Sequence, residues 1–321
     1  MAIVAARSIL FEKDYRPLFS GHETFPLRQG WLKKVFDAVS TAEPKGITSV
    51  FLADNAIARF GVGKNMVASL RHWAFHSGVI ADSGQATEFA DFLFGADGRD
   101  PYLENPASLW LLHWKLCSGE SGRLLKTTWF WAFNHFTPTT FVRKDLVDGL
   151  MKLATSQGWP RVSPTTVQRD VECFVRTYEG RLADGKTASV EDGLESALSE
   201  LGLIRGHRGR FQLVRGPKQS LPDGVFAYAL NSFWERHAGT LSTLSFEACA
   251  YAPGSPGRVF LLDESELASR LSAVEEATDG RLRWSETAGL KQLVKRGEIS
   301  AKDALGFART AYAPIKGKAT Q

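Results

Sequence analysis

Apolar residues recur every fourth position near the start of the chain. This spacing predicts a helix over residues 27–39, because positions four apart lie on one helical face. Pro26 suits the first turn of such a helix, where its missing N–H costs no hydrogen bond. The residues that form the apolar face are Leu27, Trp31, Val35 and Val39.

The next pattern is a short helix at 51–60, a break at 61–63 and a longer helix at 64–76. Gly61 allows the positive φ that a tight turn needs. With a short strand after Ser77, this order predicts a helix-turn-helix with a wing. A helical hairpin inside a larger core is the alternative. Polar side chains that would remain for DNA on the second helix are Lys64, Asn65, Arg71 and His72.

Residues 98–120 form a second block, in which apolar or aromatic residues at 109–112 and 114 leave no polar face on the predicted helix. Asn105-Pro106 opens a helix, and five aromatic residues follow between Trp129 and Phe136. A helix that is hydrophobic all round is normally buried, so this block is predicted to be the centre of the core. A platform for stacked bases is the alternative, but residues 127–134 carry no interleaved cation.

A second helix-turn-helix pattern spans residues 139–178, and its second helix begins with a Ser163-Pro164 cap. A polar insertion at 181–192 follows, and we expect it to be mobile. Two β-type runs around a Gly/Arg tip then predict a hairpin at 203–214. This order is typical of a winged helix whose wing meets the phosphate backbone. The DNA-binding candidates here are Arg169, Arg205, Arg208 and Arg210.

The C-terminal third is predicted to be mainly helical, including a basic helix from Trp284 to Arg296. The complete prediction is a mainly α protein, with helix-turn-helix or winged-helix modules and short hairpin wings around an aromatic helical core. Its expected parts are an N-terminal helix-turn-helix domain (1–97), the core with a second winged module (98–219) and a C-terminal helical region (220–321).

Charge is uneven along the chain although the net charge is only +4, from 39 cations and 35 acids. Residues 202–219 carry five cations and no acid, whereas residues 263–279 carry six acids and one cation. Local basic patches are typical of nucleic-acid binders or of subunits of complexes. A solvated surface is the alternative.

The chain lacks an apolar run of about 18 residues, so no membrane span is expected. Its three cysteines stand far apart without a C-x-x-C pair, which argues against a disulfide framework. We therefore expect a cytoplasmic protein with reduced thiols.

Two short stretches are candidates for chemistry. Residues 58–65 are similar to a phosphate-binding loop, but Ala58 and Asn65 stand where that loop needs Gly and Ser or Thr. The second stretch is His22-Glu23, which combines an acid–base group with a ligand for a hard cation, and Arg28 follows about one turn later. The alternative is a helix-capping acid beside a partly buried histidine. Asp54 is likewise either a cap or a metal ligand.

Five stretches of the chain carry a recognisable combination of motifs, at 19–28, 61–67, 222–228, 253–260 and 284–290. Together they resemble the bacterial DUF4007 family. The resemblance implies a place in a DNA phosphorothioation system and an SspB-type, magnesium-dependent nickase that opens one strand so that sulfur can be inserted. No catalytic residue is carried over from the family.

The sequence-based hypothesis is a DNA-binding protein of an anti-phage modification system that nicks one strand with Mg²⁺ (or Mn²⁺). His22, Glu23 and Arg28 are the catalytic candidates, with Glu23 and Asp54 as metal ligands. Expected partners are double-stranded DNA, sulfur-transfer and ATPase subunits, and a second copy in a homodimer. The alternatives are a non-enzymatic DNA-reading adaptor that recruits sulfur-transfer partners and a transcriptional repressor.

Overall fold

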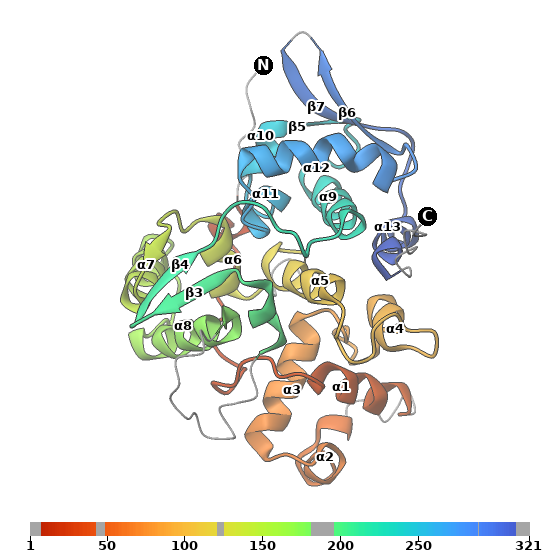
Figure 1. Ribbon diagram of the computed structural model, residues 1–321. Coiled ribbons are helices and arrows are strands. Elements are labelled where there is room, and N and C mark those ends of the chain that lie inside the picture. The colour runs from red at the N-terminus through yellow and green to blue at the C-terminus, as the bar shows by residue number, and fades with distance from the viewer. Residues whose placement is uncertain (1–7, 43–48, 121–124, 181–195, 288, 313–321) are drawn as a thin grey trace.

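The computed structural model describes residues 8–42, 49–120, 125–180, 196–287 and 289–312. The described chain is mainly helical with two small β-sheets, which confirms the predicted helical class. Figure 1 shows α1–α3 at the lower end, α5 near the centre, and the β6–β7 hairpin at the upper end. The expected insertion at 181–192 lies outside the described residues.

The N-terminal helices are α1 (Trp31–Ser40), α2 (Ala53–Phe60), α3 (Lys64–His76) and α4 (Glu88–Phe94). Helix α1 begins four residues later than predicted, because Gly30 in the left-handed region (φ 78°) is its N-cap. Gly61 closes α2 in the left-handed conformation, as the turn requires. Ile57 of α2 stays 43% exposed, while Ala56 and Phe60 enter the core.

The centre of the molecule is aromatic, as predicted. Helices α5 (Pro106–Cys117) and α6 (Thr127–Asn134) are buried on nearly every side. Asn105 caps α5 by accepting the Ala107 N–H through its side chain, and Pro106 occupies the first turn. One continuous core extends through all three predicted segments, from Phe19 to Ala308.

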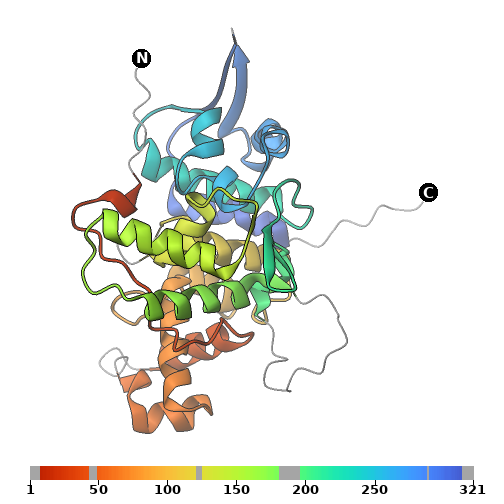
Figure 2. The same cartoon turned by 90° about the vertical axis from the view of Figure 1, so that its left-hand side faces the viewer.

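A unit of helices and strands follows α6: β1 (Thr140–Phe141), α7 (Arg143–Ser156), α8 (Pro164–Tyr178), β2 (Glu179–Gly180), the 3₁₀ turn η4 (Ala197–Leu201), β3 (Ile204–His207) and β4 (Arg210–Leu213). The sheet order is β1-β4-β3-β2, with β4 antiparallel to both β1 and β3. Arg208 and Gly209 at the hairpin tip both have positive φ, which is typical of a two-residue hairpin turn. Figure 2 shows this hairpin beside α8.

The C-terminal part likewise places helices between a first short strand and a final hairpin. It contains α9 (Asp223–His237), β5 (Thr243–Ser245), α10 (Phe246–Tyr251), α11 (Pro256–Val259), α12 (Glu264–Ala277), β6 (Leu282–Thr287), β7 (Leu290–Lys295), α13 (Ala301–Arg309) and η5 (Thr310–Tyr312). Its first strand, β5, pairs antiparallel with the last strand, β7, as β1 pairs with β4 in the preceding unit. This likeness is topological, since the sequence itself shows no repeat.

The predicted basic helix from Trp284 to Arg296 is wrong, because these residues form the β6–β7 hairpin. Leu282 and Leu293 enter the core, and Trp284 lies opposite Leu293 across the hairpin and contacts Phe246. Gly289 (φ 78°) lies in the turn between the strands. The apolar residues on β6 therefore alternate with period two, which is the period of a half-buried strand.

Candidate nucleic-acid interface

The first element of the site is a tight turn over Gly21, His22, Glu23 and Thr24. Gly21, Glu23 and Thr24 all have positive φ, at 100°, 48° and 66°. Gly21 also lies directly against α3, because a Cβ at this position would stand 2.5 Å from Nδ1 of His72. Only glycine fits both the backbone conformation and this close approach.

His22 holds the turn in place from inside the protein. Its Nε2 donates to Oδ1 of Asp170 at 2.8 Å, and its Nδ1 accepts the backbone N–H of Thr24 at 3.0 Å. The side chain is 2% exposed. Because both ring nitrogens are engaged and shielded from water, the predicted role of His22 as an acid–base group does not fit this geometry.

Asp170 is the buried centre of this cluster. Its Oδ1 also lies 2.9 Å from Nζ of Lys126, and neither side chain is exposed. Burial would raise the pKa of Asp170, but the charge of Lys126 and the hydrogen bond from His22 outweigh it and lower that pKa. The cluster therefore ties the turn before α1, the start of α6 and helix α8 together.

Neither Lys126 nor Asp170 was identified from the sequence as a residue of the site. Asp170 stands three residues after Val167 and four before Phe174, both fully buried. This helical spacing was the available signal that Asp170 faces the core.

Glu23 is exposed at the outer side of the turn. It does not cap a helix, because α1 begins with Gly30 as its N-cap. Asp54 lies in the first turn of α2, whose N-cap is Leu52, and the Asp54 side chain is outside what the structure describes. Across the described residues, no three His, Cys, Asp or Glu side chains group closely enough to hold a metal ion.

Arg28 is half-buried and packs on aromatic rings of its own segment. Its guanidinium carbon lies 5.4 Å from the Phe25 ring centre and 5.6 Å from that of Trp31. These cation–π contacts fix the orientation of the Arg28 guanidinium, which follows the turn by four residues.

A cavity of about 550 Å³ opens along the outer face of α3. The structure brings three predicted residues, Lys64, Arg71 and His72, to its wall, while Asn65 is exposed and does not line it. Lys64 and Arg71 are exposed. Other lining residues are Gly21, Phe51, Ile57, Val67, Ala68, Phe75, His76, Ile80, Ala81, Asp82 and Gly84.

His72 separates the cavity from the buried cluster. Its ring lies 5.9 Å from that of His22, and burial together with the charge of Lys126 lowers the pKa of His72 well below its usual value. Nε2 of His72 is buried without a hydrogen-bond partner among the described residues. His72 is therefore a neutral ring behind the two cations of the cavity.

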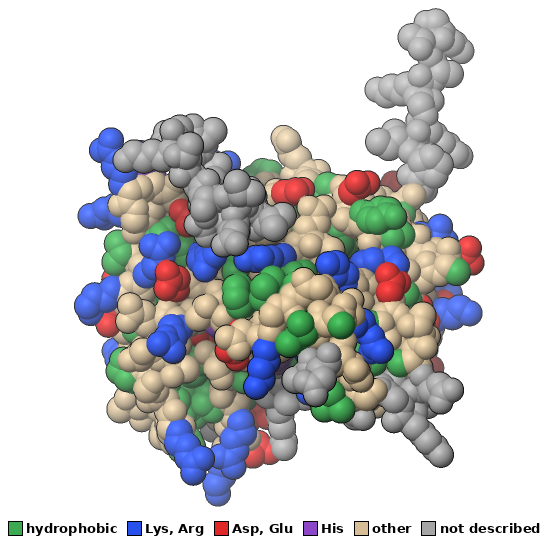
Figure 3. Space-filling view, turned by 90° about the horizontal axis from the view of Figure 1, so that it is seen from below, with side chains coloured by type: hydrophobic (Ala, Val, Ile, Leu, Met, Phe, Trp, Pro, Cys, Tyr) green, Lys and Arg blue, Asp and Glu red, His purple; other side chains and the backbone are tan. Residues whose placement is uncertain are grey.

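The second basic surface is formed by α8 and the β3–β4 hairpin. The four arginines predicted to contact DNA are all exposed: Arg169, Arg205, Arg208 and Arg210. Arg143 packs over Phe211, with its guanidinium carbon 4.6 Å from the ring centre, and supports the hairpin. Figure 3 shows Lys and Arg side chains prominent along the left-hand part of the molecule seen from below.

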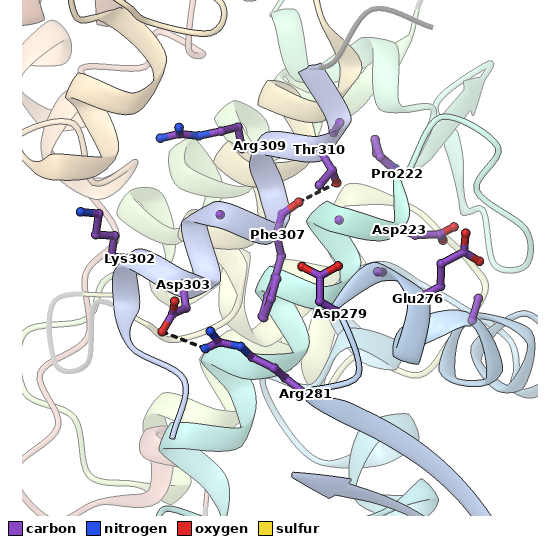
Figure 4. Close-up of a pocket in the computed structure, with 15 residues that line it drawn as sticks. Pro222, Asp223, Glu276, Asp279, Arg281, Lys302, Asp303, Phe307, Arg309 and Thr310 are labelled. Atoms are coloured by element: carbon purple, nitrogen blue, oxygen red, sulfur yellow. Dashed lines mark hydrogen bonds and ion pairs between the residues drawn. The ribbon is translucent and has the colours of Figure 1, made fainter. Parts of the chain in front are cut away.

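A separate cavity of about 750 Å³ lies between α9, α12 and α13. Figure 4 shows Asp223 and Glu276 on the side opposite Lys302 and Arg309, with the Arg281–Asp303 ion pair (3.0 Å) below. Gly224 of α9 packs on the carbonyl of Phe307, where a Cβ would stand 2.2 Å away. Close packing of α9 against α13 therefore requires glycine at position 224.

The fold defines a mainly helical protein with two small sheets. The chain belongs to the family described as "Protein of unknown function (DUF4007)", whose profile matches residues 19–308. It is similar to two solved structures, "Magnesium ion-bound SspB crystal structure" (30% identity, TM-score 0.80) and "SspB crystal structure" (28% identity, TM-score 0.78). Each comparison covers 95% of this chain and 90% of the other chain.

No functionally curated protein matches the chain. No helix in the described part of the chain is long and apolar enough to cross a membrane.

Proposed function

We propose that this protein binds double-stranded DNA and nicks one strand with Mg²⁺, as a subunit of a phosphorothioate-modification and anti-phage system. The observation that carries the DNA-binding part is the basic hairpin beside α8. In the hairpin itself, residues 204–213 include three arginines and no acid. The likeness to SspB, one structure of which is magnesium-bound, supports the nicking part.

The order α6, β1, α7, α8, β3, β4 supports a winged-helix interpretation of this unit. In such a unit the second helix of the pair enters the major groove and the hairpin contacts the adjacent backbone. Arg169 of α8 would reach the groove or its rim. Arg205, Arg208 and Arg210 would contact phosphates, which fix position without reading sequence.

The turn at Gly21–Thr24 supplies the proposed reactive group. Glu23 offers a carboxylate on a turn that the His22–Asp170 hydrogen bond holds rigid, and Mg²⁺ is commonly held by one or two carboxylates and several waters. A bound Mg²⁺ (or Mn²⁺) would lower the pKa of a coordinated water and neutralise phosphate charge. Arg28 would hold the phosphate, and His22 acts as a positioning residue.

Asp54 remains proposed as a second carboxylate for the ion. Sulfur-transfer and ATPase subunits, and a second copy of the chain, remain the proposed protein partners.

The rival functions are a DNA-reading adaptor without enzymatic activity and a transcriptional repressor. Purified protein with supercoiled plasmid separates the three. A nickase produces open circles only when Mg²⁺ is present, an adaptor binds DNA without converting it, and a repressor protects one palindromic site without cleavage. Binding without conversion in the presence of Mg²⁺ would overturn the nickase proposal.

A further inference from the structure

The cavity on α3 has the size of a small-molecule site. At about 550 Å³ it falls inside the range of roughly 300–1,000 Å³ that is usual for ligand pockets. A helix that only reads a DNA groove presents a convex surface. Here the helix face is hollowed between α3 and Phe51 and Ile57, which come from the preceding elements.

One wall of the cavity is apolar and flat. Phe51, Ile57, Val67 and Phe75 line it, and Phe51 is stacked on Phe60 with ring centres 5.9 Å apart and planes 19° apart. A supported aromatic ring of this kind accepts another flat ring on its face, and every nucleobase has such a face.

The charge of the cavity favours an anion. Lys64 and Arg71 stand seven residues apart, about two turns, on the same side of α3. The guanidinium carbon of Arg71 lies over the Phe51 ring, 5.7 Å from its centre, so a cation stands at the aromatic wall itself. Asp82 is the one acid among the described lining residues.

We propose that the α3 cavity binds a single nucleotide, with its base against Phe51 and its phosphate between Lys64 and Arg71. The inference rests on the proposed DNA function for its biological source, which is a nucleotide turned out of the DNA strand. A free nucleotide has the same chemistry. Turning a base out of the stack is unfavourable, and stacking on an aromatic ring offsets this cost in part.

The test uses the full chain and two variants that act on the cavity in different ways. Ala68→Trp fills the cavity from an exposed position on α3, and Arg71→Ala removes a cation without filling it. The matched control is Ala58→Trp, which adds the same side chain at an exposed position of α2 outside the lining. Circular dichroism verifies that each variant is folded.

Two probes distinguish the sources of the nucleotide. Calorimetry measures binding of the four free deoxynucleoside 5′-monophosphates, and fluorescence of 2-aminopurine in a duplex reports a base that has left the stack. Binding in either assay is expected for the wild-type protein and Ala58→Trp. Ala68→Trp should weaken nucleotide binding at least tenfold, and Arg71→Ala should weaken it several-fold. The assay that responds identifies free nucleotide or strand nucleotide as the source.

The proposal is overturned if neither probe responds with the wild-type protein, or if Ala68→Trp and Ala58→Trp behave alike. Binding of an ordinary duplex, followed by anisotropy, separates this failure from failure of the proposed function. If only the cavity proposal fails, the wild-type protein still binds the duplex. If the proposed DNA function fails, the wild-type protein does not bind the duplex. In that case the free-nucleotide assay still decides the cavity proposal.

Discussion

The imidazole of His22 donates a 2.8 Å hydrogen bond to the carboxylate of Asp170, which lies 148 residues further along the chain. This contact joins the turn that carries Glu23 to helix α8, which carries Arg169. Glu23 and Arg169, which are proposed to act on DNA, therefore lie on two elements that the same buried cluster holds together. Lys126 completes the cluster with the opposite charge.

Asp170→Asn should strongly destabilise the protein. The substitution leaves the ammonium of Lys126 buried without a counter-charge, and breaking a buried pair in this way costs about 3–5 kcal/mol. Urea denaturation measures the free energy of unfolding. The control is Asp148→Asn, which removes an exposed i,i+4 pair with Lys144 and should cost less than about 0.5 kcal/mol. Equal losses in the two variants would contradict the cluster.

Stability should fall as the pH decreases below about 6.5, because buried histidines fold in their neutral form. Burial lowers the pKa of His113 to about 4, and its Nε2 donates to the Val259 carbonyl at 2.8 Å. Since the unfolded ring binds its proton near pH 6.5, stability is lost between that pH and about 4. For one such histidine, the free energy of unfolding decreases by about 3 kcal/mol as the pH falls through this interval.

His113→Gln should flatten this pH dependence, which is measured as melting temperature against pH. His207→Gln, at an exposed position of the hairpin, is the control and should leave the profile as it is. An unchanged profile in His113→Gln would assign the acid sensitivity to other groups.

The sequence predicted those elements whose signals are local. Asn105-Pro106 and Ser163-Pro164 begin helices in the structure as predicted, because capping depends on neighbours within one turn. The Arg208-Gly209 tip was found for the same reason. The basic hairpin β6–β7 was not predicted, because Leu282 and Trp284 alone give a short signal of strand alternation.

The candidate site was harder to predict because its contacts cross long stretches of chain. Lys64 and Arg71 could be placed on one face of α3 from their spacing alone. Nothing local indicates that the Phe51 ring packs under Arg71 at the cavity wall, or that Lys126 neutralises Asp170. His22 was singled out by its neighbour Glu23, but only the fold shows that both of its nitrogens are engaged.

Replacing Arg208 and Arg210 together by Ser should weaken DNA binding to all sequences alike. Contacts to phosphate carry no base information, and each lost contact reduces the salt slope by about one unit. Anisotropy titrations at several salt concentrations, on two unrelated duplexes, measure both effects. Loss of sequence preference with unchanged affinity would contradict a backbone role for the hairpin tip.

Glu23→Ala decides whether the turn at Gly21–Thr24 is the reactive site, and the measurement is the rate at which supercoiled plasmid becomes open circles with Mg²⁺. The wild-type protein is expected to nick, whereas Glu23→Ala should lose nicking while its DNA affinity and melting temperature stay nearly unchanged. An exposed carboxylate that caps no helix should contribute little to stability. Nicking by purified Glu23→Ala at the wild-type rate would show that Glu23 does not hold the catalytic metal.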